Sequence, residues 1–221
     1  PAPTYINTLS LHDALPISVP FFILAGFIME KAGISKRLIH LAVIIIGPIR
    51  GGFATASIAV CLFWGAISGS GPATVAALGP ILIPGMIAQG YAAGFAAALV
   101  AASAAIAVVI PPSINLVVYG VITGESIGGL LIGGVFPGLL MGFCFMVYAY
   151  FYSVKHNNRG GARGSAKEIL HALKDSFWGL LSPIIILGGI YGGFFTPTEA
   201  AVVSCVFILF IVLFVYKEFK M

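Results

Sequence analysis

The long, nearly uncharged stretch in the middle of this sequence constrains its fold more than any other feature. Between Arg50 and Lys155, about a hundred residues carry a single charged side chain, that of Glu125. Over the whole chain 8% of the residues are charged and 60% are hydrophobic, whereas a soluble domain carries roughly 25% charged residues. So few charges cannot cover the surface of a water-soluble fold. The sequence therefore predicts an all-α integral membrane protein, a multi-span helical bundle in the lipid bilayer.

The charged residues gather in loops at the ends of the apolar runs. The formal net charge is +4, but the basic residues do not line one face, so the positive-inside rule explains them better than a nucleic-acid partner does. The polar segment 153–176 holds five Lys or Arg against Glu168 and Asp175. This excess of positive charge predicts that the segment is a cytoplasmic loop.

The chain divides into parts with different composition. Residues 1–18 are polar, lack the basic start and the cleavage site of a signal peptide, and contain TLSLHDALPIS, which resembles translated sequencing-adapter sequence. We expect this segment to be a non-native leader. The further predicted parts are an N-terminal helix with an interfacial arm helix (19–50), a re-entrant hairpin (51–91), a broken helix and the following span (92–152), the basic loop (153–176) and two more spans (177–221).

The first of two breaks in the apolar sequence is the tip of the predicted hairpin. Two apolar pieces, 51–67 and 75–88, flank the sequence SGSGPAT, and paired short pieces with a Gly/Pro break indicate a re-entrant hairpin. Glycine permits positive φ angles, proline suits a first helical turn, and hydroxyl groups supply the neutral oxygens that sodium prefers and transition metals do not. The candidate sodium- and substrate-binding residues here are Ser68, Gly69, Ser70, Gly71, Pro72 and Thr74.

The second break lies in the predicted broken helix. A helix is expected over 92–110 and again over 114–122, because two consecutive prolines remove two backbone donors and prevent a continuous helix. The candidate residues of this break are Pro111, Pro112, Ser113 and Asn115. Irregular backbone in the middle of a membrane survives only inside protein or beside a cavity, so each break marks a candidate site. Helix ends with free carbonyls suit a cation, and ends with free amides suit an anion.

Simpler interpretations of these residues stay open. The sequence SGSGPAT is also compatible with a plain turn between two spans, and the two prolines with a packing kink. Asn115 alone suits a hydrogen bond between helices as well as it suits ligand binding. Glu125 and Glu199 lie next to predicted span ends, where capping or solvation is favoured over a role in proton transfer.

From Val19 to its end the chain resembles the large permease subunit of TRAP transporters, the DctM-like family. The phrases that carry the resemblance are VPFFILAGFIMEKAGISKRL, GAISGSGPATVAALGPILIPGM, IPPSINLVVYG and GGFFTPTEAAVV. The resemblance implies an elevator-type transporter with two inverted repeats, each with a hairpin and a broken helix. It also implies a sodium site between the tip, 68–74, and the break, 111–115, at the edge of the substrate site.

Several partners and a location follow from the resemblance. A small membrane subunit and a periplasmic solute-binding protein complete such a transporter, which lies in the bacterial inner membrane and imports C4-dicarboxylates, sialic acid or related organic carboxylates with sodium as the coupling ion. Family members are about twice as long as this chain, in which we find neither a second hairpin nor a second broken helix. We therefore expect that this chain alone does not transport.

Two alternative functions remain at this point, and a third is disfavoured. Another sodium/anion symporter has hairpins and broken helices of the same kind, and an inactive structural membrane fragment satisfies every argument from composition. An intramembrane enzyme needs a nucleophile with its base, or metal ligands, within the spans. The predicted spans contain no His, no Asp and no H-E-x-x-H motif. We expect no enzyme activity, no catalytic residue, no cofactor and no transition metal.

Overall fold

The computed structural model describes residues 20–21, 23–158, 160–161 and 164–216, and every regular element within them is helical. Residues 23–31 form a helix that precedes the labelled ones. The predicted leader, 1–18, lies outside the described residues. The labelled elements are α2 (Ile34–Ile46), α3 (Gly52–Ser68), α4 (Gly71–Ala88), α5 (Ala93–Ala105), the 3-10 turn η1 (Ile106–Val108), α6 (Ile114–Thr123), α7 (Ile127–Lys155), α8 (Ala166–Tyr191), α9 (Pro197–Phe210) and the π-helical end η2 (Ile211–Tyr216).

Helix α3 is the centre of the bundle. It packs against α2, α4, α5 and α7, and its side chains are buried on every side of the helix, including Ile58, Cys61 and Trp64. A helix that is apolar all round is stable only when other helices surround it. This explains why α3 carries no charged residue along its length.

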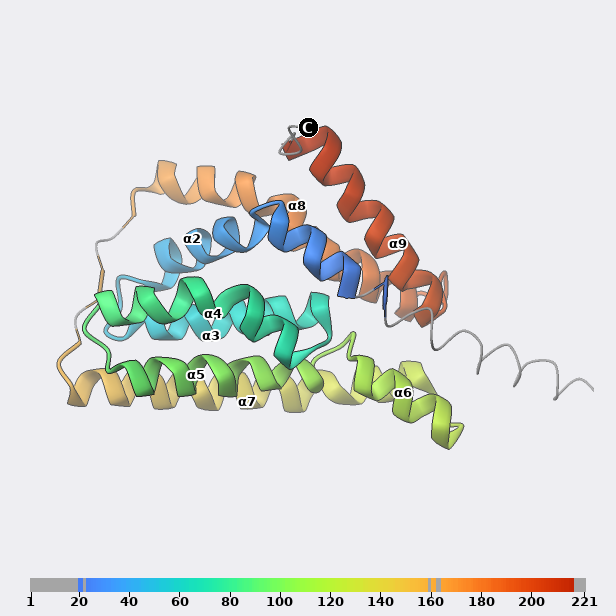
Figure 1. Cartoon of the computed structure of the whole chain (residues 1–221), viewed down its shortest axis with the longest axis horizontal. Helices are drawn as coiled ribbons and strands as arrows, with labels where there is room; N and C mark the ends of the chain where they lie inside the picture. The colour runs from blue at the N-terminus through green and yellow to red at the C-terminus, as the bar shows by residue number, and fades with distance from the viewer. Residues whose placement is uncertain (1–19, 22, 159, 162–163, 217–221) are drawn as a thin grey trace, which may run out of the picture.

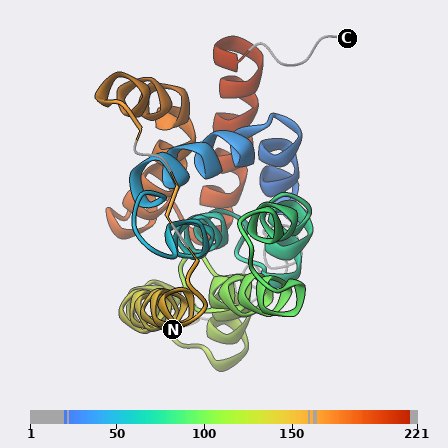
Figure 2. The same ribbon diagram turned by 90° about the vertical axis from the view of Figure 1, so that its left-hand side faces the viewer.

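The helices lie in layers on either side of α3 (Figures 1 and 2). Helices α5 and α7 run side by side below α3 and α4, while α2 lies above them and packs on α8, which in turn packs on α9. Three helices within the described residues are long and apolar enough to cross a membrane: α4, α7 and α8. The predicted all-α membrane class is confirmed.

The basic segment contains less loop than the sequence predicts. Helix α7 continues to Lys155, and α8 begins at Ala166, so the last part of the 153–176 segment is helical. The cause is a capping box: the Ser165 hydroxyl accepts from backbone amides of the first turn, and the Glu168 carboxylate accepts from the Ser165 amide. These bonds satisfy the free amides of the helix start well before the apolar run begins at Phe177.

Candidate functional site

The hairpin tip is narrower than the predicted SGSGPAT break. Only Gly69 and Ser70 lie between α3 and α4, because Gly69 adopts a left-handed conformation (φ 60°) that ends α3 and turns the chain back. The Ser70 side chain then accepts from the Ala73 amide and caps α4, and Pro72 occupies the second helical position. Gly71 and Thr74, predicted as part of the break, belong to the first turn of α4.

Three oxygen atoms converge inside the tip. The Ser68 and Thr74 hydroxyls lie 3.0 Å apart, and the Thr74 hydroxyl donates to the Ser70 carbonyl at 2.8 Å. Ser68 and Thr74 are fully buried. These neutral oxygens come from both helices of the hairpin, so the tip presents a small oxygen cluster without a carboxylate among its own residues.

The break in the second helix is longer than the tip. Helix α5 ends at Ala105, earlier than the predicted Ile110, and tightens into η1 before the irregular residues 109–113, where the Pro111-Pro112 peptide is cis. The two prolines cannot donate backbone hydrogen bonds, so no continuous helix passes the break. Ser113 joins the two sides of the break, because its hydroxyl donates to the Val108 carbonyl and accepts from the Leu116 amide.

The tip and the break touch each other through their backbones. A Cβ atom placed on Gly69 would lie 2.5 Å from the Pro112 carbonyl oxygen and 3.1 Å from the Ile114 amide nitrogen. The same test on Gly65, one turn before Gly69 in α3, gives 2.7 Å to the Cβ atom of Ala107 in η1. Glycine at these positions is what allows the hairpin to approach the broken helix so closely.

The break in the second helix lies against the first half of α7 rather than at its end. A Cβ atom on Gly134 would lie 2.3 Å from the Val109 carbonyl oxygen, and one on Gly138 would lie 2.3 Å from the Ile110 side chain. A Cβ atom on Gly142 would likewise lie 2.3 Å from the Leu62 side chain. These three glycines form a ridge of small residues at every fourth position of α7. Figure 1 shows the α3–α4 hairpin turning back near the α5–α6 break.

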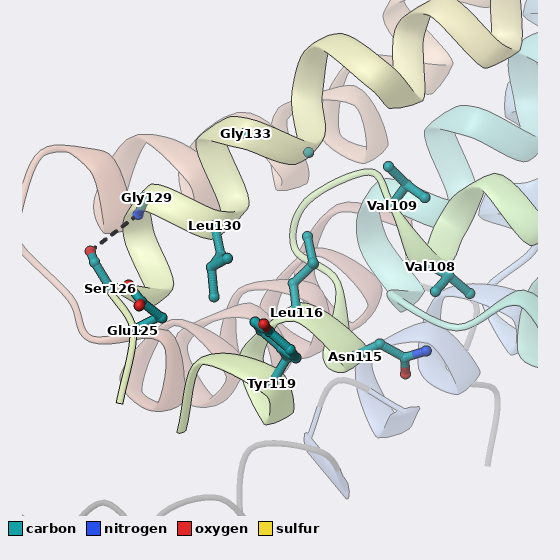
Figure 3. A pocket seen from close by; sticks show the side chains of 11 residues that line it. Val108, Val109, Asn115, Leu116, Tyr119, Glu125, Ser126, Gly129, Leu130 and Gly133 are labelled. Atoms are coloured by element: carbon teal, nitrogen blue, oxygen red, sulfur yellow. Dashed lines mark hydrogen bonds between the residues drawn. The ribbon is translucent and has the colours of Figure 1, made fainter. Parts of the chain in front are cut away.

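A hollow of about 680 Å³ opens beside the break, between α6 and α7. Figure 3 shows Asn115 at one end of the hollow and Glu125 with Ser126 at the other, with Leu116 and Tyr119 of α6 facing Leu130 of α7. The Ser126 hydroxyl accepts from the Gly129 amide at 3.2 Å and so caps α7. The lining is mostly apolar, with a few polar groups at the ends.

The structure gathers most of the predicted site residues but not all of them. Ser68, Gly69, Ser70, Thr74, Pro112 and Ser113 lie within the tip or the break that it touches. Pro111 is buried in the break, Gly71 packs against α5, Pro72 is exposed, and the exposed Asn115 lines the neighbouring hollow.

Several residues around the site were missed by the sequence reasoning. A smaller hollow of about 160 Å³ borders Ser68 on its other side and is lined in part by Gly26 and Glu30 of the first helix. No local motif marks these two residues. The glycine ridge on α7, in contrast, carries a readable signal, because small residues spaced by four are typical of close helix contacts in membranes.

Of the two glutamates at span ends, one is a cap and one is not. Glu199 accepts from the Thr196 amide and hydroxyl at 2.7 and 2.9 Å, in a capping box that starts α9. Glu125 is exposed next to Ser126, which is the residue that caps α7.

A membrane helix bundle in which a helical hairpin meets a broken helix at mid-length has the architecture of a secondary transporter. The chain belongs to one such family: the model of the Tripartite ATP-independent periplasmic transporter, DctM component, matches residues 4–221. The match begins at residue 4, inside the segment 1–18. That this segment is a non-native leader therefore stays a prediction.

Three relatives that the chain resembles are named as TRAP transporter permeases. The chain is 50% identical to the isethionate TRAP transporter permease protein DctMQ of Oleidesulfovibrio alaskensis, over 93% of this chain and 33% of the relative. It is 44% identical to the C4-dicarboxylate TRAP transporter large permease protein DctM of Vibrio cholerae, over 98% of this chain and 48% of the relative. Identity to the sialic acid TRAP transporter large permease protein SiaM of Vibrio cholerae is 41%, over 91% and 47%. The chain spans about half the length, or less, of these relatives.

Proposed function

We propose that this chain is part of the large permease of a sodium-coupled TRAP transporter that imports small organic acids. The observation that carries the proposal is the contact between the hairpin tip and the broken helix, which brings four helix ends to one place inside the bundle. Each type of helix end offers a different partial charge. The pair of breaks therefore supplies separate positions for a cation and for an anion.

The carbonyl ends and the hydroxyl cluster form the proposed sodium site. Helix α3 and the turn η1 both end here, at Ser68 and Val108, and their last carbonyls carry partial negative charge. The oxygens of Ser68, Ser70 and Thr74 lie within hydrogen-bonding distance of one another, and the Pro112 carbonyl faces Gly69. A neutral, oxygen-only ligand set of this kind suits sodium.

The amide ends form the proposed position for the substrate carboxylate. Helices α4 and α6 begin at Gly71 and Ile114, on the two sides of the Gly69 contact. The first turn of a helix carries partial positive charge and unpaired amides, which stabilise an anion. Since the hollow beside Asn115 opens next to the α6 start, we propose that an organic acid enters from that side.

The proposal includes the partners that the names of the relatives imply. A TRAP transporter of this type works with a small membrane subunit and a periplasmic solute-binding protein in the bacterial inner membrane. Relatives are named for isethionate, C4-dicarboxylates and sialic acid and for ectoine, all of them small organic acids with a carboxylate or sulfonate group. We propose that the substrate of this chain belongs to the same class.

Uptake by the complete transporter tests this function. The full-length permease that contains this chain is reconstituted into proteoliposomes with the small subunit and the binding protein, and uptake of labelled C4-dicarboxylate, sialic acid and isethionate is measured against sodium concentration. We compare Thr74→Val with Thr123→Val, because Thr123 makes the same bond to the carbonyl four residues earlier but is exposed at the end of α6.

We expect sodium-dependent uptake in the wild type. Thr74→Val removes one oxygen of the proposed site and should raise the sodium concentration for half-maximal uptake roughly tenfold, the equivalent of ~1.4 kcal/mol. Thr123→Val should leave that concentration unchanged. Uptake that does not depend on the sodium concentration, or a Thr74→Val variant with wild-type sodium dependence, would overturn the proposed sodium site.

A further inference from the structure

The exposed side of α8 near its start combines an apolar hollow with lysines. A hollow of about 360 Å³ is lined by Leu173, Lys174, Phe177 and Trp178, and Leu173 and Phe177 are 43% and 49% exposed. Leu170, one turn earlier, is 55% exposed. At 100° per residue these three apolar side chains fall on one stripe of the helix.

Basic and acidic side chains lie on different sides of this stripe. Lys167 and Lys174 lie seven residues apart, on the same flank of the apolar stripe, and both are exposed. The acidic residues of this part of α8 lie farther round the helix and have partners of their own. Glu168 accepts from the Ser165 amide at 2.7 Å, and Asp175 pairs with His171 at 3.1 Å. The flank beside the hollow is therefore positive.

The length of α8 places this hollow at the edge of the hydrocarbon layer. From Lys174 to the last residue of α8, Tyr191, the helix rises about 26 Å at 1.5 Å per residue, close to the ~30 Å thickness of a bilayer core. With Tyr191 near one interface, Lys174 reaches the headgroups of the other. Trp178 then lies where tryptophan is enriched in membrane proteins.

We propose that this face of α8 binds an anionic phospholipid. An acyl chain would fill the hollow formed by Leu173, Phe177 and Trp178, and the headgroup phosphate would lie between the Lys174 and Lys167 amines. Anionic lipid is favoured over zwitterionic lipid because both flanking side chains are cationic, and each lysine near an anionic surface contributes about 1 kcal/mol. A bound lipid of this type would fix the depth of α8 in the membrane.

Tryptophan fluorescence offers a direct test, since the chain has two tryptophans in very different surroundings. Trp64 is buried in the core at 1% exposure, whereas Trp178 lines the hollow. The full-length permease that contains this chain is reconstituted with phospholipids that carry bromine on their acyl chains, which quench tryptophan only on contact. Brominated phosphatidylglycerol is compared with brominated phosphatidylcholine at equal mole fraction, and Trp178→Phe supplies the background from Trp64 and from any tryptophan outside this chain.

We expect phosphatidylglycerol to quench Trp178 more strongly than phosphatidylcholine does. The preference should fall about fivefold in Lys167→Gln and again in Lys174→Gln, the equivalent of ~1 kcal/mol for each lysine, and by about the product in the double variant. Lys155→Gln, which removes an exposed lysine at the end of α7, is the matched control and should keep the preference.

A second measurement uses the wild type alone. Its preference for phosphatidylglycerol should weaken as salt is added, because salt screens the attraction between the lysines and the lipid phosphate. Equal quenching by the two lipids, or a preference that the double variant retains, would overturn the proposal. Quenching by neither lipid would also overturn it, since the face would then be covered by protein, either a second copy of the chain or a partner subunit.

Discussion

The hairpin tip and the broken helix interrupt their helices in different ways. In the tip two residues, Gly69 and Ser70, separate α3 from α4, and the chain reverses its direction. In the broken helix the residues 109–113 separate η1 from α6, and the chain continues toward the same end of the bundle (Figure 1). The tip depends on a glycine with positive φ, whereas the longer break depends on two prolines that cannot donate backbone hydrogen bonds.

The two breaks share one replaceable feature, a serine cap, and differ in the residue that ends the preceding helix. Both breaks end in a serine that caps the next helix, Ser70 in the tip and Ser113 in the broken helix. The two caps use the same chemistry, because each serine hydroxyl accepts a hydrogen bond from a backbone amide in the first turn of the next helix. The glycine of the tip is not replaceable, because it combines a left-handed backbone with a contact to the Pro112 carbonyl that leaves no space for a side chain.

The largest effect is expected from Gly69→Ala. The new Cβ atom costs about 1–2 kcal/mol for the left-handed backbone and about 1–3 kcal/mol for the contact with Pro112. We expect a lower free energy of unfolding in detergent and loss of uptake by the complete transporter. The apparent melting temperature in detergent, monitored by size-exclusion chromatography, reports the loss of stability.

Gly124→Ala is the control that separates the two costs. Gly124 has a φ of 74°, close to that of Gly69, but a Cβ atom there meets nothing within 4 Å. This variant should show only the backbone cost of about 1–2 kcal/mol and keep sodium-dependent uptake. Equal losses in the two variants would contradict the conclusion that contact between tip and break makes Gly69 irreplaceable.

A smaller effect is expected where the break rests on α7. Gly134→Ala places a Cβ atom 2.3 Å from the Val109 carbonyl, whereas Gly133→Ala, its neighbour in the helix, meets nothing within 4 Å. The first variant should lose about 2 kcal/mol through overpacking, and the second should be neutral or gain through helix propensity. Unfolding in detergent compares the pair, and a Gly134→Ala variant as stable as Gly133→Ala would show that the break does not need its support on α7.

The sequence located both breaks, and the family resemblance implied that they meet, but neither indicated which residues touch. The Gly/Pro punctuation and the short flanking runs predicted a tip near Ser68 and an interruption at Pro111, because local backbone chemistry decides where a helix must stop. The boundaries differ from the predicted ones by a few residues: Ser70 caps α4, which begins at Gly71, and α5 tightens into η1 before its prolines. These shifts depend on local geometry that composition does not encode.

The individual residue contacts between distant segments could not be predicted for the same reason. Nothing near Gly69 in the sequence indicates that Pro112 will lie against it, and Glu30 borders Ser68 only because the first helix packs on the hairpin. The extent of α8 was underestimated because a polar, basic segment was interpreted as loop, although Ser165 and Glu168 form a capping box that is readable in the sequence. Whether the gathered oxygens bind sodium stays a prediction.

The smallest effect is expected from Ser113, and it tests whether a cap inside the break behaves differently from a cap at an exposed helix start. Ser113→Ala removes a cap worth about 1 kcal/mol and leaves the Val108 carbonyl without its donor inside the bundle. Ser126→Ala removes a cap of similar geometry at the exposed start of α7, where water replaces the lost bond. Hydrogen exchange should therefore accelerate at the Leu116 amide in Ser113→Ala by more than at the Gly129 amide in Ser126→Ala. Ser113→Thr keeps the hydroxyl and should restore protection, whereas equal acceleration in the two alanine variants would mean that water already reaches the break.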